Sequence, residues 1–384
     1  MKLRRPPAPG SADTKTRSIG RGISVGLLIV VASLLVVVSV VGIWLNTVAF
    51  DTPTWRSTSR QMIQNPAIQH EVSQYLVGQL YDSNVTQSEI NKALPPALQQ
   101  FSPAVTNGLR QFAVQAGERL LGRPNVQDLW VAANDKAHTE LVNLIENKST
   151  FTNVDNGKVV LDLHAVLLNV ANEAGIGAAA QRLLPANAGY LTVMSSSELS
   201  SVQSATRIIH AVALWVPLVT IVLFALAIWI ARGFRRRALL WSAIGVLLAA
   251  GALMLVRQEL GTKIIDALAS DTAVRPALIE AWFIGTQVLG TINQTLMIAA
   301  IVLIAGVWLA GAGRFSTATR RGLAPWIMNP FSAFGIPAAI LIILAVWGPL
   351  PVFQKLIPMI IIVVLSAVGI EALRRLTITE HASR

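Results

Sequence analysis

The chain has 384 residues, of which 53% are hydrophobic and 13% are charged, and its formal net charge is +11. About a quarter of the residues in a soluble domain are charged, so this composition excludes a single soluble globular domain. Because the chain contains no cysteine, it has no disulfides, zinc–thiolate sites or cysteine nucleophiles. The apolar residues occur in long blocks, which predict membrane spans rather than one large core.

The first apolar block covers residues 23–45 and follows a basic tail, residues 1–22. A helix of this length is about 35 Å long, enough to cross a bilayer. A signal peptide also begins with basic residues, but its apolar segment is usually about 7–15 residues long. We therefore predict a retained transmembrane helix. In the alternative, cleaved form, Thr47-Val48-Ala49 is the candidate cleavage site.

Residues 46–207 are long enough for one domain with its own core. Asn65-Pro66 is typical of a helix start, with asparagine as the cap and proline in the first turn. Apolar residues at a 3.6-residue period predict three helices, near residues 68–80, 109–120 and 126–145. Asp155-Asn156-Gly157 predicts a β-hairpin, a short helix is expected at residues 163–174, and Tyr190–Met194 is a candidate third strand. The predicted fold is a mainly helical α+β domain.

Five further spans are predicted after this domain, at residues 208–231, 238–256, 286–312, 330–348 and 352–373. Residues 257–285 form the loop between the second and third of these, and residues 374–384 form a tail. In this loop an apolar stripe predicts a helix lying on the membrane surface or beneath the outside domain, and Arg275-Pro276 is expected to begin a second short helix. The fold class is thus an all-α membrane bundle of about six transmembrane helices that carries an extracytoplasmic domain.

The distribution of lysine and arginine predicts the orientation. With the N-terminus in the cytoplasm and six spans, the cytoplasmic segments hold sixteen basic and three acidic residues, whereas the remaining segments hold fifteen basic and seventeen acidic residues. Basic residues concentrate on the cytoplasmic side of membrane proteins. We therefore predict a plasma-membrane protein with both termini in the cytoplasm. The same distribution explains the positive charge without nucleic acid, because basic loops lie against anionic lipid headgroups.

No catalytic, metal-binding or cofactor-binding motif stands out in the sequence, and no cofactor is expected. Trp130, Asn134 and His138 are four residues apart, so they share one face of a predicted helix. The trio is interpreted as structural, with a neutral, hydrogen-bonded His138. A ligand contact is the alternative, in which Asp135 pairs with the imidazole or shares a metal ion with it.

Ionisable residues near the middle of a span mark ion pathways. His210, Lys355 and Glu371 all lie near the ends of predicted spans, which weighs against a proton-driven pump. The span at residues 286–312 begins with a polar cluster that includes Gln287, Asn293 and Gln294. Such groups line a cavity or hydrogen-bond to neighbouring helices, and the second reading is favoured.

Two other features concern helix ends and helix contacts. Ser196 or Ser197, within Ser195-Ser196-Ser197, is expected to cap the helix that leads into the second span. Pairs of small residues, such as Gly22 with Gly26 and Gly245 with Ala249, allow helices to approach closely. These contacts serve either packing within the bundle or self-association.

Four short motifs in the sequence are Trp130-x3-Asn134-x2-Ala137-His138, Val160-Leu161-Asp162-Leu163, Ser197-x-Leu199-x3-Gln203 and Arg235-Arg236-Arg237-Ala238-Leu239-Leu240. Through these motifs the chain resembles a family of uncharacterised actinobacterial integral membrane proteins. The resemblance implies the same topology and no assigned activity. The order of one span, an outside domain and five spans is also similar to half of a resistance–nodulation–division transporter, but residues 286–312 lack the carboxylates that those pumps carry.

The leading hypothesis is a non-enzymatic cell-envelope protein that binds or scaffolds through its extracytoplasmic domain. The expected partners are membrane lipids and either other envelope proteins or further copies of the chain. The alternative is a transporter or lipid-handling protein with a cavity among the last five spans, and an enzyme is the third and least favoured reading.

Overall fold

The computed structural model describes residues 11–81, 102–146, 152–155, 158–162, 190–269, 272–311, 313–347 and 356–382. The chain divides into two compact units. The bundle unit consists of Met1–Trp44, Ala211–Gln258 and Val288–Arg384, and the polar unit consists of Leu45–His210 and Glu259–Gln287. The polar unit therefore includes most of the loop predicted at residues 257–285 as well as the segment before the second span.

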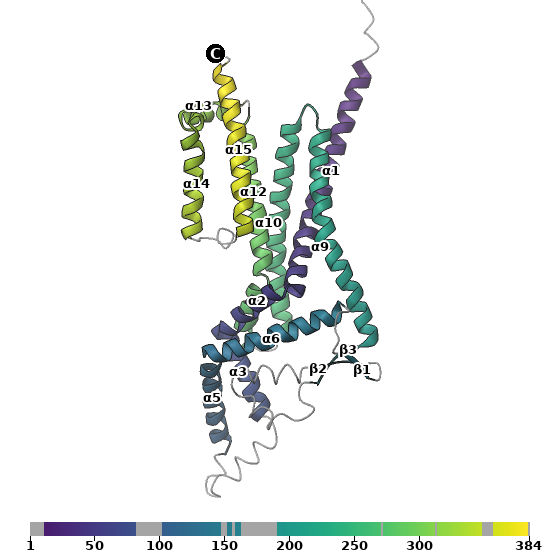
Figure 1. Ribbon diagram of the computed structural model, residues 1–384, viewed down its shortest axis with the longest axis vertical. Helices are drawn as coiled ribbons and strands as arrows, with labels where there is room; N and C mark the ends of the chain where they lie inside the picture. Colours follow the sequence, from purple (N-terminus) through teal and green to yellow (C-terminus); the bar gives the residue numbers. More distant parts are fainter. Residues whose placement is uncertain are drawn as a thin grey trace, which may run out of the picture. The chain divides into compact units, whose positions relative to one another are not determined.

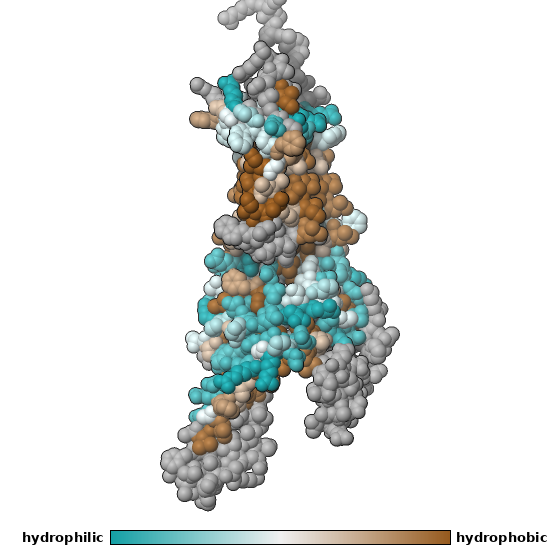
Figure 2. Space-filling view, turned by 60° about the vertical axis from the view of Figure 1, so that its left-hand side comes forward, coloured by the Kyte–Doolittle hydropathy of each residue, from teal (hydrophilic) through white to brown (hydrophobic). Residues whose placement is uncertain are grey.

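Four helices in the described residues are long and apolar enough to cross a membrane. They are α1 (Ser11–Phe50), α9 (Ser196–Ile230), α10 (Arg235–Leu268) and α12 (Gln287–Leu309). Figure 2 shows hydrophobic side chains gathered in a band over the long helices. Together these helices indicate a multi-pass membrane protein, as the hydropathy of the sequence predicts.

Small side chains and interdigitating apolar residues hold the bundle unit together. Val36 and Val40 of α1 pack with Leu253 of α10 and Leu289 of α12 in one buried cluster. A Cβ placed on Gly42 would lie 2.8 Å from Val212 Cγ1 of α9, so glycine is needed at this approach. The buried hydroxyls of Ser39 and Thr220 also lie 3.3 Å apart between α1 and α9.

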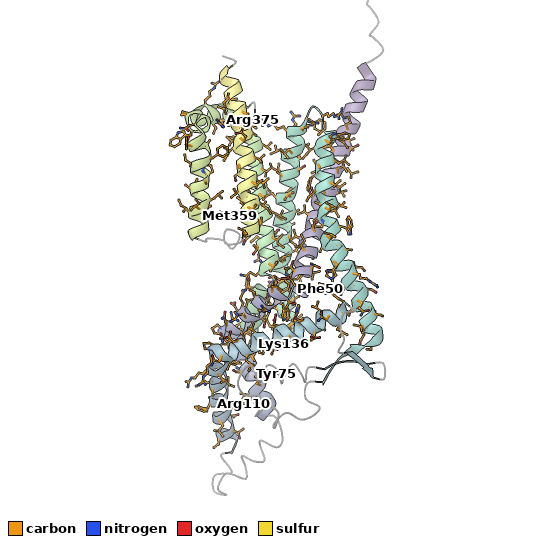
Figure 3. All side chains as sticks on the ribbon, in the orientation of Figure 1. Phe50, Tyr75, Arg110, Lys136, Met359 and Arg375 are labelled. Atoms are coloured by element: carbon orange, nitrogen blue, oxygen red, sulfur yellow. The ribbon has the colours of Figure 1, made fainter. Side chains whose placement is uncertain are left out.

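The last part of the bundle unit contains α13 (Arg314–Met328), α14 (Pro330–Trp347) and α15 (Leu356–Ala382). These three helices contact one another, and α14 and α15 lie side by side in Figure 1. Ile362 of α15 is buried, and the side chains that pack against it include Met359, which is labelled in Figure 3, Leu341 of α14 and Ile298 of α12. This apolar cluster joins the last helices to α12.

The polar unit is built mainly from α2 (Thr52–Gln64), α3 (Pro66–Tyr81), α5 (Ser102–Leu121), α6 (Pro124–Ile145) and α11 (Arg275–Gly285). Its buried core groups Ile63, Leu121 and Val131, which come from α2, α5 and α6. Helix α11 contacts both α2 and α3, and Asn65 Nδ2 donates a hydrogen bond of 3.0 Å to Glu280 Oε2. Residues beyond position 258 thus complete this unit.

A small antiparallel sheet accompanies these helices in the order β1-β2-β3. The strands are β1 (Thr152–Asp155), β2 (Lys158–Asp162) and β3 (Tyr190–Ser195). The register pairs Val154 with Val159 in the hairpin and Val160 with Thr192 in the second pair, with an irregularity between Val159 and Val160. The sequence predicts these three strands, whereas the helix expected at residues 163–174 lies outside the described residues.

Side-chain caps mark the starts of α3 and α9. Asn65 Oδ1 accepts hydrogen bonds from the backbone of Ala67 and Ile68, as expected for a cap. The cap of α9 is one residue earlier than predicted: Ser195, rather than Ser196 or Ser197, exchanges hydrogen bonds with Glu198. Serine followed three residues later by glutamate is a capping box, and this pattern identifies Ser195.

Three helices differ from the sequence expectations. The third span and the predicted surface helix after it form one continuous helix, α10, because no proline or glycine-rich turn interrupts residues 235–268. Helix α2 was not predicted, although Asp51 caps it through Thr54 and Pro53 lies in its first turn. Helix α13 was also not predicted, because its charged residues and Pro325 are typical of a loop.

Candidate functional site

His138 of α6 lies at the centre of a group of contacts in the polar unit. Its side chain is buried, with 6% exposure, and its Nε2 lies 3.2 Å from the carbonyl oxygen of Ala49 in the last turn of α1. Because a carbonyl only accepts hydrogen bonds, Nε2 carries the proton. Nδ1 then accepts the hydroxyl of Thr52 at 3.5 Å. The ring of Trp55 stacks on the imidazole at 4.8 Å, so one face and both ring nitrogens of His138 have structural contacts.

The surroundings of His138 favour the neutral imidazole. Burial lowers the pKa of His138, while the Ala49 carbonyl and the more distant Asp135 and Asp51 oppose this effect. A neutral imidazole satisfies both the carbonyl and the hydroxyl, as the preceding contacts require. The residue therefore joins α6 to the end of α1 and the start of α2.

Trp130 and Asn134 lie on the same helix but do not share the burial of His138. Trp130 is 36% exposed, and its Nε1 donates to Ser59 Oγ at 3.1 Å. Asn134 Nδ2 donates to the carbonyl of Trp130, one turn earlier in α6. The three residues thus make separate contacts, and the described contacts do not bring them together around one ligand.

Asp135 pairs with Arg56 of α2 rather than with His138. The same two helices are linked again by Arg60 and Asp128, whose Nη1 and Oδ1 atoms are 2.9 Å apart. The hydrogen bond from Arg56 to Asp135, together with the negative charge of Asp135, raises the pKa of the Arg56 guanidinium. The arrangement places the carboxylate in an ion pair between α2 and α6, and no group of three potential metal ligands occurs in the part of the chain that the structure describes.

A polar cleft of about 400 Å³ lies between α3 and α5. His70 Nδ1 lies 2.5 Å from Glu118 Oε1, and Gln74 lies beside the other ring nitrogen at 2.7 Å. Arg110, labelled on α5 in Figure 3, also lines the cleft, together with Gln111, Val114 and Gln115. Such a lining offers donors, acceptors and both signs of charge to a polar ligand.

The sequence reasoning missed this cleft as a site. His70 and Gln74 are four residues apart, and Gln111, Gln115 and Glu118 also follow helical spacing. Each helix therefore shows a polar row beside its apolar row. What the spacing does not reveal is that the two rows face each other, which depends on the packing of α3 on α5. This packing is close, because a Cβ on Gly117 would lie 2.8 Å from Ser73 Oγ.

The three residues of the predicted intramembrane polar cluster belong to two different units of the structure. Gln287 belongs to the polar unit, whereas Asn293 and Gln294 of α12 belong to the bundle unit. Asn293 Nδ2 donates to the carbonyl of Ala250 on α10 at 2.9 Å, which is the helix-to-helix hydrogen bond that the sequence favours. The cavity that the two side chains line is small, at about 20 Å³.

Arg257 lies beside this cavity. A Cβ on Gly290 of α12 would lie 2.8 Å from its Nη1 atom, so glycine makes room for the guanidinium. The side-chain carbonyl oxygens of Asn293 and Gln294 are buried without a hydrogen-bond partner. A space of this size with several polar neighbours suits one water molecule and is too small for an organic substrate.

The ionisable residues predicted near span ends have local partners where they are described. His210 Nε2 lies 3.3 Å from Glu146 Oε1, and its ring contacts Phe50. Glu371 pairs with Arg375 at 2.8 Å on α15, where Figure 3 labels Arg375. Lys355 lies outside the described residues.

Two arginines at one end of the bundle unit bind helix C-termini. Arg21 Nη2 donates to the carbonyls of Ile230 and Arg232 at 2.9 and 3.1 Å, at the end of α9. Arg236 Nε donates to the carbonyl of Val307 at 3.0 Å, near the end of α12. Terminal helix carbonyls lack partners within their own helix and carry partial negative charge. These basic residues therefore have structural roles beyond attraction to headgroups.

Comparison with known proteins adds no assignment: the sequence matches no protein-family model, and no curated protein or solved structure proved similar. The fold and the contacts of individual residues therefore carry the functional argument.

Proposed function

We propose that this multi-pass membrane protein acts in the cell envelope as a non-enzymatic binding protein, with the polar unit outside the membrane. The observation that supports the proposal is the cleft between α3 and α5, where His70, Gln74, Arg110 and Glu118 converge on about 400 Å³. Binding sites for small groups combine a concave surface with a few placed polar side chains. In this proposal a polar, charged part of a partner molecule occupies the cleft.

The proposed topology has six spans, with α14 and α15 as the last two, and both termini in the cytoplasm. It is supported by the sixteen-to-three excess of basic over acidic residues on the proposed inner side. Reporter fusions at Gly157 and Asp271 should read outside, and fusions at Gly233 and Gly313 should read inside. A cytoplasmic readout at Gly157 would overturn the arrangement.

The binding proposal is tested by site-specific photocrosslinking in native membranes. A photoreactive side chain replaces Gln111 in the cleft, and in a matched control it replaces Arg119, which is exposed on α5 but does not line the cleft. We expect a discrete adduct from position 111 only. The adduct should be lost in Glu118→Gln, which keeps the shape of the side chain and removes its charge.

Two results would contradict the proposal. The first is that the photoreactive side chain gives the same adducts at position 111 and at position 119, which would indicate random collision. The second is an unchanged adduct in Glu118→Gln at an equal protein level, which would show that the charged cleft does not recognise the partner. The nature of the adduct, protein or small molecule, then identifies the partner class.

The second candidate function is a transporter or a lipid-handling protein, and the structure bears differently on solute transport and on lipid binding. The polar cavity beside Asn293 and Gln294 has room for a water molecule rather than for a transported solute. An apolar groove in the bundle unit, described next, favours lipid binding instead.

A further inference from the structure

A groove of about 720 Å³ runs between α1 and α10 within the bundle unit. On α1 it extends from Gly22 to Val37, and on the other side from Phe234, just before α10, to Ala252. At a rise of 1.5 Å per residue, the α1 side is about 22 Å long. One leaflet is about half of the ~30 Å hydrocarbon core, so the groove is long enough for a lipid chain in one leaflet.

Glycines keep the groove open. No described atom lies within 4 Å of a Cβ placed on Gly22 or Gly26, whereas at Gly245 the two helices touch. A Cβ at Gly245 would overlap Ser33 Oγ and lie 3.4 Å from Ser33 Cβ and 3.6 Å from Ile29 Cγ2. The helices are therefore in contact at Gly245, and beside Gly22 and Gly26 there is unfilled space bounded by apolar side chains.

One end of the groove is basic. Arg237 lines it, with Trp241 one helical turn further along α10, and Arg235 and Arg236 precede Arg237 in the sequence. No carboxylate is found among the described residues that form the lining. Arg21 and Arg236 donate to helix carbonyls, but Arg237 is exposed and has no ion-pair partner in the described ranges.

We propose that this groove is a binding site for one anionic phospholipid. An acyl chain lies along the apolar wall between Gly26 and Leu248, and the phosphate binds the Arg237 guanidinium. Arginine matches phosphate through parallel hydrogen bonds, and a tryptophan at the level of the headgroups is typical of membrane proteins. The lipid belongs to the leaflet at the arginine end of the helices.

Charge favours a lipid over a second copy of the chain. A parallel copy packed on Gly22 and Gly26 would bring two sets of the Arg235–Arg237 cluster together, and like charges repel. An anionic lipid fills the same space and neutralises one of these charges. The site is independent of the cleft between α3 and α5, so either proposal stands without the other.

The test uses the full chain in detergent, with bound lipid counted by native mass spectrometry. Phosphatidylglycerol is titrated against phosphatidylcholine with identical chains, and glycerol phosphate serves as the headgroup without chains. We expect one molecule of phosphatidylglycerol to be retained. Phosphatidylcholine and glycerol phosphate should not be retained. Since a basic residue at the membrane surface contributes about a factor of five in lipid affinity, Arg237→Gln should reduce retention about fivefold, whereas Arg235→Gln should not change it.

A second variant tests the apolar half of the site. Gly26 has room for an added Cβ, because no described atom lies within 4 Å of that position, so Gly26→Leu should place its side chain in the groove and remove the retained lipid. Gly251→Leu is the matched control, since its Cβ position is equally free and it does not line the groove. If Gly26→Leu does not fold, Arg237→Gln still decides the question.

Three outcomes would overturn the proposal. Equal retention of phosphatidylcholine would remove the role of the phosphate charge. Full retention of phosphatidylglycerol in Gly26→Leu would place the lipid elsewhere. Loss of a dimer, rather than of a lipid, in Gly26→Leu would assign the groove to a second copy of the chain.

Discussion

Replacement of His138 by alanine tests the central packing contact of the polar unit. The change removes the hydrogen bond to the Ala49 carbonyl, which contributes about 1 kcal/mol, and the stack on Trp55, which contributes about 0.5–1.5 kcal/mol. It also leaves a space at a site that is 6% exposed in the native protein. Together these losses amount to about 2–4 kcal/mol. Trp130→Ala should cost less, because Trp130 is 36% exposed.

The assay is amide hydrogen exchange of the full chain in nanodiscs, followed by mass spectrometry. Peptides from α6 should exchange faster in His138→Ala than in the native protein, with a smaller change in Trp130→Ala. The sequence alone favours the opposite ranking, since a large aromatic in an apolar stripe is expected to be buried. A larger effect of Trp130→Ala would show that the burial of these two side chains does not set their contributions to stability.

The same histidine gives the polar unit a pH dependence. Burial lowers the pKa of His138 in the folded state, so the unfolded chain takes up a proton at a higher pH than the folded chain. The stabilising contribution is fully present above the ordinary histidine pKa of about 6.5. It is lost as the pH falls from there through the folded pKa, by at most about 1.4 kcal/mol per pH unit. His138→Gln should reduce this acid sensitivity, and an unchanged profile would assign it to other groups.

Two further predictions concern the bundle unit. Gly245→Ala should lower the thermal unfolding temperature, by the equivalent of about 1–3 kcal/mol, because the new Cβ would overlap Ser33 on α1. Gly251→Ala, with no described atom within 4 Å, should be neutral or stabilising, and an equal loss in both variants would contradict the close helix contact. Arg236→Gln should speed amide exchange in the last turn of α12, since it removes a donor to a terminal carbonyl. Arg235→Gln should leave that turn unchanged, and a matching effect would show that the loss of charge alone is responsible.

Much of the fold follows from local signals in the sequence. Hydropathy predicts the four long apolar helices, because a bilayer requires about twenty consecutive apolar residues with their backbone hydrogen bonds made internally. Asn65 and Ser195 begin helices through contacts with residues two or three positions away. The three strands likewise follow from a turn sequence and short apolar runs. Signals of this kind act over a few residues and do not require knowledge of the tertiary structure.

The helices that were missed show the limit of such signals. In α2 the cap at Asp51 and the proline at position 53 are visible in the sequence. Few residues of this helix are apolar, so a search for apolar segments does not identify it. The end of α10 is not marked by a proline or by a glycine-rich turn. The helix continues to Leu268, although the apolar segment that predicts the span ends earlier, at residue 256.

Hydropathy and residue spacing are sufficient to identify a multi-pass membrane protein, its long apolar helices and the chemical character of each helix face. Which of these faces meet depends on the tertiary structure. It pairs Asp135 with Arg56 rather than with His138, places His138 against the end of α1, and sets Arg237 at the end of an open groove. These contacts join residues that are distant in sequence, and their geometry depends on how whole helices pack. For this reason the residue types of a site could be predicted, whereas its partners could not.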